Sequence, residues 1–143
     1  MFASRIVNKI IYTKLAAATG VKNVVSTRIV RGVGYPPGTI LPACLFYMEQ
    51  STYDAGQLAG AEHIDGERMR YVVRFDDVGT TDARIAPAAE AALTALAGLV
   101  TDAPTGEQVT FHATGEVPLT SYVDGDTFYQ RLGTIYSVDV TRG

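Results

Sequence analysis

The sequence lacks features on which several classes of protein depend. Cys44 is its only cysteine, so neither an intramolecular disulfide nor a cysteine-based zinc site can form, and we expect its side chain to be buried as a small apolar group. No run of about 18 apolar residues occurs, as a membrane-spanning helix would require. Because Asn8, Lys9 and Lys14 interrupt the apolar pattern of the first 20 residues, we expect no signal peptide and a protein that is cytosolic when it is made.

Positive charge is also sparse. Twelve Lys and Arg stand against fifteen Asp and Glu, and no run of five or more basic residues occurs. A dedicated nucleic-acid binder usually carries a cationic patch, so this composition disfavours that class, although a fold could still gather scattered arginines. Apolar residues make up 47% of the chain and charged residues 19%, which predicts one packed domain over residues 1–143.

The recognisable catalytic and nucleotide-binding motifs are missing as well. There is no G-x-S-x-G, G-x-x-x-x-G-K-[ST] or H-E-x-x-H sequence, and the glycines at 32 and 34 are followed by Pro36 and Pro37, which defeat a dinucleotide-binding loop. His63 has acidic neighbours but no second histidine or cysteine nearby, so a solvated polar loop is favoured over a metal site. We therefore predict no catalytic, cofactor-binding or metal-binding residues and no enzyme activity.

Hydrophobic periodicity predicts the secondary structure. Helical spacing of apolar residues predicts a helix over 4–18 that ends at Gly20, and a second helix over 82–99 that either kinks at Pro87 or begins near it. Strands are predicted at 23–31, 41–49 (placed at the centre of the sheet), 68–76, 107–114 and 132–140. Their order predicts an α+β fold in which two helices pack on one face of a mostly antiparallel sheet of four to five strands.

Two segments are long for simple connections, namely 51–67 and 115–127, and long loops in compact domains are often functional. The strand at 68–76 places alternate arginines on the face opposite its apolar side chains. We predict that these three regions contact other proteins. The candidate interaction residues are Tyr53, Asp54, Gln57, Glu62 and His63 in the first segment, Arg68, Arg70 and Arg74 on the strand, and Tyr122, Asp124 and Asp126 in the second segment.

Local sequence patterns add a resemblance to a known family. The passages that carry it are Ile11 to Leu15, Arg28-Ile29-Val30, Pro37-Gly38, Leu41-Pro42, Leu45-Phe46-Tyr47, Tyr53-Asp54 with Gly56 or Gly60, Tyr71 to Phe75, Thr81 to Ala89, Ala91 to Leu99 and Gly133 to Val140. In this order they resemble the tail-completion, or tail-terminator, family of long-tailed bacteriophages. Cys44-Leu45, where that family often has β-branched residues, and Pro87 depart from its pattern.

The resemblance implies a structural virion protein that forms a ring, usually of six subunits. Such a ring caps the finished tail tube and joins it to the neck of the head. Its partners would be further copies of itself, the tail-tube protein and a neck or head-completion protein, with genomic DNA passing through the lumen without sequence-specific binding. It would assemble in the host cytoplasm, reside at the head-proximal end of the virion tail, and need no cofactor or membrane.

Two alternatives stay open from the residues. A neck, head-completion or tail-tube protein would also form rings, and polymerisation into long tubes would identify the tube protein. A protein of a different class, a small α+β enzyme or ligand-binding domain, would use His112, Tyr136 and Asp139 on paired strands. Strand register decides whether these three side chains can meet.

Overall fold

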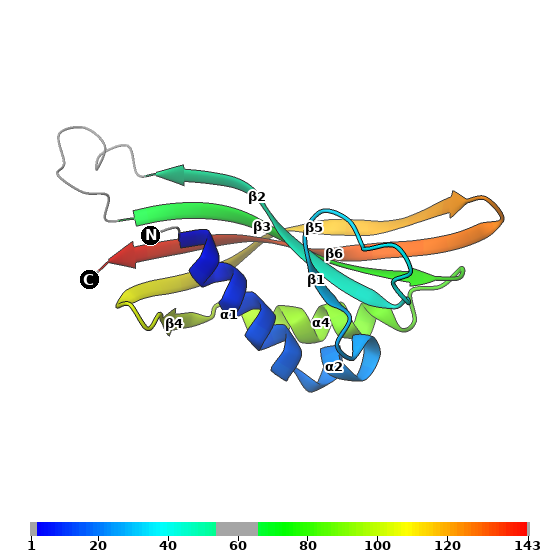
Figure 1. Ribbon diagram of the computed structural model, residues 1–143, viewed down its shortest axis with the longest axis horizontal. Helices are drawn as coiled ribbons and strands as arrows, with labels where there is room; N and C mark the ends of the chain where they lie inside the picture. The colour runs from blue at the N-terminus through cyan, green and yellow to red at the C-terminus, as the bar shows by residue number, and fades with distance from the viewer. Residues whose placement is uncertain (1–2, 54–65, 143) are drawn as a thin grey trace.

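A computed structural model describes residues 3–53 and 66–142, in which three helices cover one face of a six-stranded sheet (Figure 1). The elements in chain order are α1 (Ala3–Ala17), α2 (Thr19–Val25), β1 (Ile29–Arg31), β2 (Ala43–Tyr53), β3 (Gly66–Val78), α4 (Ile85–Leu96), β4 (Val100–Asp102), β5 (Glu107–Asp124) and β6 (Thr127–Arg142). The predicted α+β class is therefore confirmed.

The sheet is mixed and larger than predicted. Its strand order is β1-β2-β3-β6-β5-β4, and β1 pairs with β2 in parallel while the other neighbours are antiparallel. The strand predicted over 41–49 begins at Ala43 and lies second from the edge, so its central placement was wrong. The two middle strands are β3 and β6.

The N-terminal region contains a helix that the sequence pattern did not predict. Residues predicted as the start of a strand form α2, and only Ile29–Arg31 is extended. Gly20 does not cap α1 but lies inside α2, where a Cβ atom would come within 2.6 Å of the Ala91 Cβ on α4. Close packing of α2 on α4 thus outweighs the strand preference of the β-branched residues in this segment.

Of the two predictions for Pro87, a kinked helix or a helix that begins near it, the structure shows the second. Helix α4 begins at Ile85, so Pro87 lies in the first turn, where its missing N–H would have had no intrahelical partner. The helix buries Ile85, Ala88, Ala92 and Leu96 against the sheet.

The most consequential difference lies in β5 and β6. Residues 115–127, predicted to be irregular, complete one long hairpin that turns at Gly125, whose φ is +63°. The register shifts between Ala113 and Gly115 and again between Val117 and Thr120. Each shift moves the following side chains to the other face, which breaks the alternation that would have revealed the strand.

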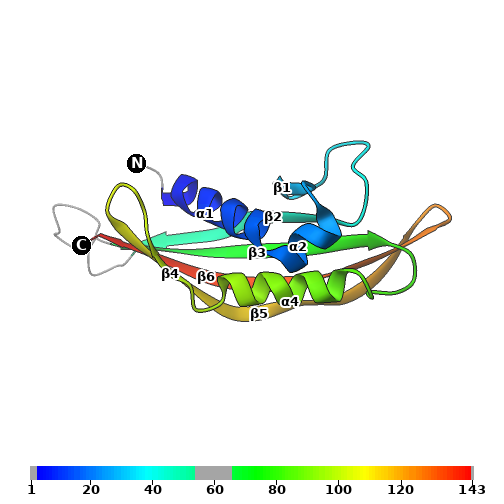
Figure 2. The same ribbon diagram turned by 90° about the horizontal axis from the view of Figure 1, so that it is seen from below.

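The core lies between the helices and one face of the sheet. The alternation predicted on β3 is confirmed, because Met69, Tyr71, Val73 and Phe75 are all buried against the helices. Helix α1 contributes Val7, Ile11 and Leu15. All three helices lie on the same side (Figure 2), and we call the opposite side of the sheet the outer face.

Strands β3 and β6 approach closely at Gly133, which leads to a prediction about stability. A Cβ atom there would overlap the carbonyl oxygen of Val73 and lie 2.9 Å from the Cα of Arg74. We expect Gly133→Ala to lower the free energy of unfolding by about 3 kcal/mol in urea denaturation, because backbone at the sheet centre must shift.

Gly115→Ala on β5 is the matched control. Its added Cβ would lie 3.6 Å from the nearest atom, Ile135 Cδ1, which is ordinary contact. The control should change stability by about 0.5 kcal/mol or less. Equal effects of the two substitutions would show that the close approach at Gly133 is not a constraint.

Candidate functional site

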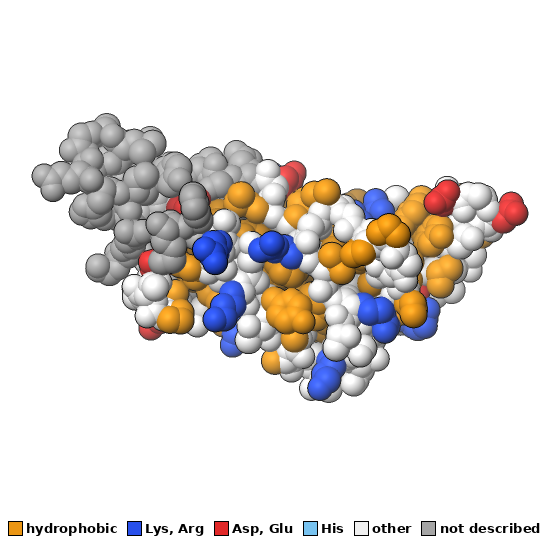
Figure 3. All heavy atoms as spheres, in the orientation of Figure 1, with side chains coloured by type: hydrophobic (Ala, Val, Ile, Leu, Met, Phe, Trp, Pro, Cys, Tyr) orange, Lys and Arg blue, Asp and Glu red, His pale blue; other side chains and the backbone are white. Residues whose placement is uncertain are grey.

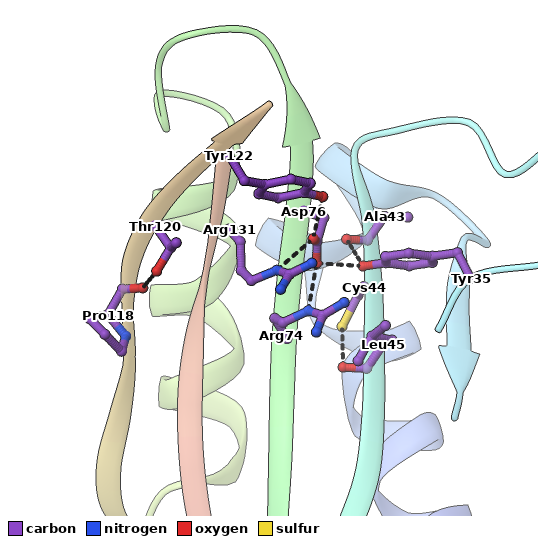
Figure 4. Close-up of polar contacts among 10 residues, drawn as sticks. All are labelled: Tyr35, Ala43, Cys44, Leu45, Arg74, Asp76, Pro118, Thr120, Tyr122 and Arg131. Atoms are coloured by element: carbon purple, nitrogen blue, oxygen red, sulfur yellow. Dashed lines mark hydrogen bonds and ion pairs between the residues drawn. The ribbon is translucent and has the colours of Figure 1, made fainter. Parts of the chain in front are cut away.

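A buried carboxylate on the outer face joins four segments of the chain. Asp76, near the end of β3, is 1% exposed and accepts four side-chain hydrogen bonds (Figure 4). Its Oδ1 accepts from Tyr35 Oη at 3.0 Å and from Arg74 Nε at 2.8 Å. Its Oδ2 accepts from Arg131 Nε at 3.1 Å and from Tyr122 Oη at 3.2 Å. We call these five residues the Asp76 cluster.

Aromatic contacts extend the cluster along the hairpin. The ring of Tyr122 on β5 stacks on Tyr129 of β6, with centroids 5.0 Å apart and planes inclined by 15°. The guanidinium of Arg131 lies 4.6 Å from the centroid of the Tyr122 ring, within cation–π range. These ionic, hydrogen-bond and stacking contacts therefore hold the hairpin near its turn, where only the Val123–Phe128 and Asp124–Thr127 pairs lie beyond Tyr122 and Tyr129.

The electrostatics of the cluster favour a structural role for Asp76. A carboxylate has about four lone-pair positions, and four donors occupy them here. Burial, followed by the nearby Asp76 charge, raises the pKa of both the Tyr35 and the Tyr122 hydroxyl, so both remain protonated donors at neutral pH. The cluster therefore links the loop that contains Tyr35 to the strands β3, β5 and β6.

The next residue anchors the other side of the sheet. Asp77 is 2% exposed and pairs with Arg84, just before α4, through contacts of 2.9 Å (Nε to Oδ2) and 2.7 Å (Nη2 to Oδ1). Consecutive carboxylates thus point to opposite faces, as expected for a strand. Strand β3 continues to Val78, two residues beyond the end predicted at Asp76.

The three predicted interaction arginines share the outer face and are each ion-paired. Arg68 Nε lies 2.7 Å from Asp139 Oδ1, and Arg70 Nε lies 3.3 Å from Glu49 Oε2. Arg74 belongs to the Asp76 cluster. Their positive charge is therefore compensated by carboxylates on neighbouring strands.

The other predicted interaction residues are divided. Tyr122 lies in the Asp76 cluster, while Asp124 and Asp126 are exposed at the end of the hairpin. Tyr53 is the last residue of β2, where only the backbone is described. Asp54, Gln57, Glu62 and His63 lie outside the described residues.

The register separates the three residues of the enzyme hypothesis. His112 and Asp139 meet on the outer face, with 3.8 Å between Nε2 and Oδ2. Tyr136 is 1% exposed and faces the helices, where it packs edge to face with Phe111. Burial raises the pKa of the Tyr136 hydroxyl to about 12. The structure therefore does not bring the three groups together.

Cys44 is fully buried, as predicted. Burial raises the pKa of its thiol well above the ordinary value, which keeps it protonated and unreactive. Across the described ranges, no three His, Cys, Asp or Glu side chains group as metal ligands would. No helix in those ranges has both the length and the apolar composition to cross a membrane.

The end of the hairpin, next to its turn, exposes apolar side chains. Val123 and Phe128 face each other across the two strands and are 56% and 52% exposed. On β6, Phe128 lies on the same face as Tyr136 and Val138, which the helices cover. The hairpin extends past the ends of those helices (Figures 1 and 2), so the core face of the sheet continues there without a cover.

The Asp76 cluster yields a second prediction. Asp76→Asn should lower the free energy of unfolding by about 3 kcal/mol, because Arg74 and Arg131 lose their carboxylate partner in a mostly buried place. Asp139→Asn, which breaks a pair with the exposed Arg68, should cost less than about 1 kcal/mol. Urea denaturation of both variants checks this, and an equal loss in the two would contradict the anchoring role.

Comparison with models of known protein families gives no match for this chain, and comparison with curated proteins gives none either. A functional assignment therefore depends on the geometry, burial and charge described above.

Proposed function

We propose that this protein is a ring-forming structural subunit of the phage tail-terminator kind. The ring, usually of six subunits, would cap the tail tube and join it to the head–neck connector. The observation that carries this proposal is the long β5–β6 hairpin, which projects beyond the helices with Val123 and Phe128 exposed on the continuation of the core face (Figure 1).

The exposed apolar pair argues for a protein partner. The same strand face buries Tyr136 and Val138 beneath helices of its own chain, and removing apolar area from water is favourable by roughly 25 cal/mol per Å². An arm of this kind fits a neighbouring subunit, because a projecting element that meets a different surface makes a head-to-tail contact. Contacts of that type close into rings when the rotation between subunits allows it.

The Asp76 cluster supports the same proposal, because it lies directly next to the exposed pair at the end of the hairpin. Tyr122 and Arg131, one on each strand of the hairpin, are both bonded to the carboxylate on β3. This attachment limits the directions in which the arm can point before assembly. A pre-organised arm loses less conformational entropy when it binds, which favours association.

The expected partners follow from the proposal. They are further copies of this chain, the tail-tube protein and a neck or head-completion protein, with genomic DNA passing through the lumen. On the outer face, Arg68 and Arg70 are paired with carboxylates. Paired arginines bind phosphate less strongly, which is compatible with DNA passing through the lumen without being held. A tail-tube subunit, the nearest alternative, would polymerise into long tubes, whereas a terminator stops at a closed ring and binds preassembled tails.

The role of the arm is tested by Val123→Ser. The substitution should change folding stability by less than about 0.5 kcal/mol, because the side chain is 56% exposed, yet weaken self-association about tenfold through lost apolar contact. Sedimentation velocity over a concentration series measures the second effect. Electron microscopy of the wild-type protein separates closed rings from long tubes.

Val100→Ser provides a matched control, since Val100 has the same 56% exposure and lies on the short edge strand β4. It should leave the sedimentation profile unchanged. If Val123→Ser associates as tightly as the wild type, or if Val100→Ser loses association to the same extent, the hairpin is not the surface through which subunits associate.

A further inference from the structure

Charge is segregated along the chain in a way that the net value of −3 conceals. Residues 1–48 contain six Lys and Arg and no Asp or Glu. Residues 85–130 contain six Asp and Glu and no Lys or Arg. The first segment forms α1, α2 and β1 and enters β2, whereas the second forms α4, β4 and β5 and reaches the start of β6. We call the first segment the basic region and the second the acidic region, and they form different elements of the fold.

The basic region includes a stripe along the solvent side of α1. Arg5, Lys9 and Tyr12 are exposed and follow the i, i+4, i+7 spacing that aligns side chains on one helix face. Tyr12 is 46% exposed, and none of the three has an ion pair or side-chain hydrogen bond within the described part of the chain. Lys and Arg side chains gather over α1 in Figure 3. We call these three residues the α1 stripe.

The acidic region includes the end of the hairpin. Asp124 and Asp126 flank the turn at Gly125, and both are exposed without a side-chain partner among the residues described. Acidic side chains mark this extremity in Figure 3. Val123 and Phe128 lie directly behind them on the strands. The tip thus combines negative charge with uncovered apolar surface.

The two surfaces cannot meet within one copy. The α1 helix begins near the opposite end of the molecule from the hairpin turn (Figures 1 and 2). A complementary partner for either surface must therefore come from outside the subunit. Another copy of the same chain supplies the complementary charge to both at once.

We infer that the hairpin tip of one copy docks on the α1 stripe of the next, with Asp124 and Asp126 facing Arg5 and Lys9. The ring of Tyr12 then covers apolar surface at Val123 and Phe128. The inference deepens the proposed function and rests on it, because it names the receiving surface for the arm. Complementary charges of this kind steer encounter and fix orientation, while the apolar contact supplies most of the affinity.

Charge reversal on each side tests the docking. Arg5→Glu with Lys9→Glu, and separately Asp124→Lys with Asp126→Lys, should each weaken self-association of the full chain by about tenfold or more, because attraction becomes repulsion. An equimolar mixture of the two variants should recover assembly, since the lysine-bearing tip meets the glutamate-bearing helix. Multi-angle light scattering measures the mass of each sample.

Lys22→Glu on α2 and Glu90→Lys on α4 are matched controls, being exposed residues outside the stripe and the tip. Both should assemble as the wild-type protein does. Recovery in the mixture also demonstrates that the reversed variants are folded. Association of the wild type that weakens as salt rises would support the same contact.

The outcomes separate the two proposals. If the wild type forms rings and both reversed variants still do, or if the mixture fails to recover, the docking inference is overturned and the ring proposal survives. If the wild type remains monomeric, both are overturned. Binding of fluorescent duplex DNA that is lost in Arg5→Glu with Lys9→Glu, without any change in subunit association, would instead make the stripe a polyanion site and overturn the docking.

Discussion

The hydrogen bonds and ion pairs made by the Asp76 carboxylate hold the end of the β5–β6 hairpin to the rest of the sheet. The carboxylate lies where β3, β6 and β5 run side by side, and its donors come from both strands of the hairpin as well as from the loop at Tyr35. Burying one carboxylate with two guanidinium groups is expensive unless every bond is made, and here the four hydrogen bonds satisfy it. On the helix side, Asp77 and Arg84 hold the start of α4 at the same level. Beyond this level the hairpin continues without helices.

Part of this fold could be predicted from the sequence, and the successes and failures have physical reasons. The alternation on β3 was readable because residues 68–76 contain no register shift and are buried on the helix side. The α2 helix was missed because it depends on Gly20 approaching Ala91, a contact between positions far apart in the chain. The outer hairpin was missed because two bulges interrupt its period of two.

The candidate site was the least predictable part. Tyr122, Asp124 and Asp126 are all predicted interaction residues, but Tyr122 anchors the hairpin while the two aspartates are exposed at its tip. No local pattern links Tyr35, Asp76 and Arg131, since only strand pairing brings them together. The sequence gives only a weak indication of Asp76, namely an acidic residue at the end of an otherwise alternating strand. The resemblance to tail terminators added a function that residue patterns alone do not reach, and it stays a proposal.

The mass of the wild-type protein in solution, measured by light scattering over a range of concentrations, tests the ring proposal most directly. The ring proposal, with the six subunits that are usual for tail terminators, predicts a closed species of about six times the 15.3 kDa chain mass that does not grow further as concentration rises. Negative-stain images of the same sample should show rings of uniform diameter. A mass of 15.3 kDa at every concentration would contradict the proposal, and continuous growth into filaments would assign the chain to a tail tube instead.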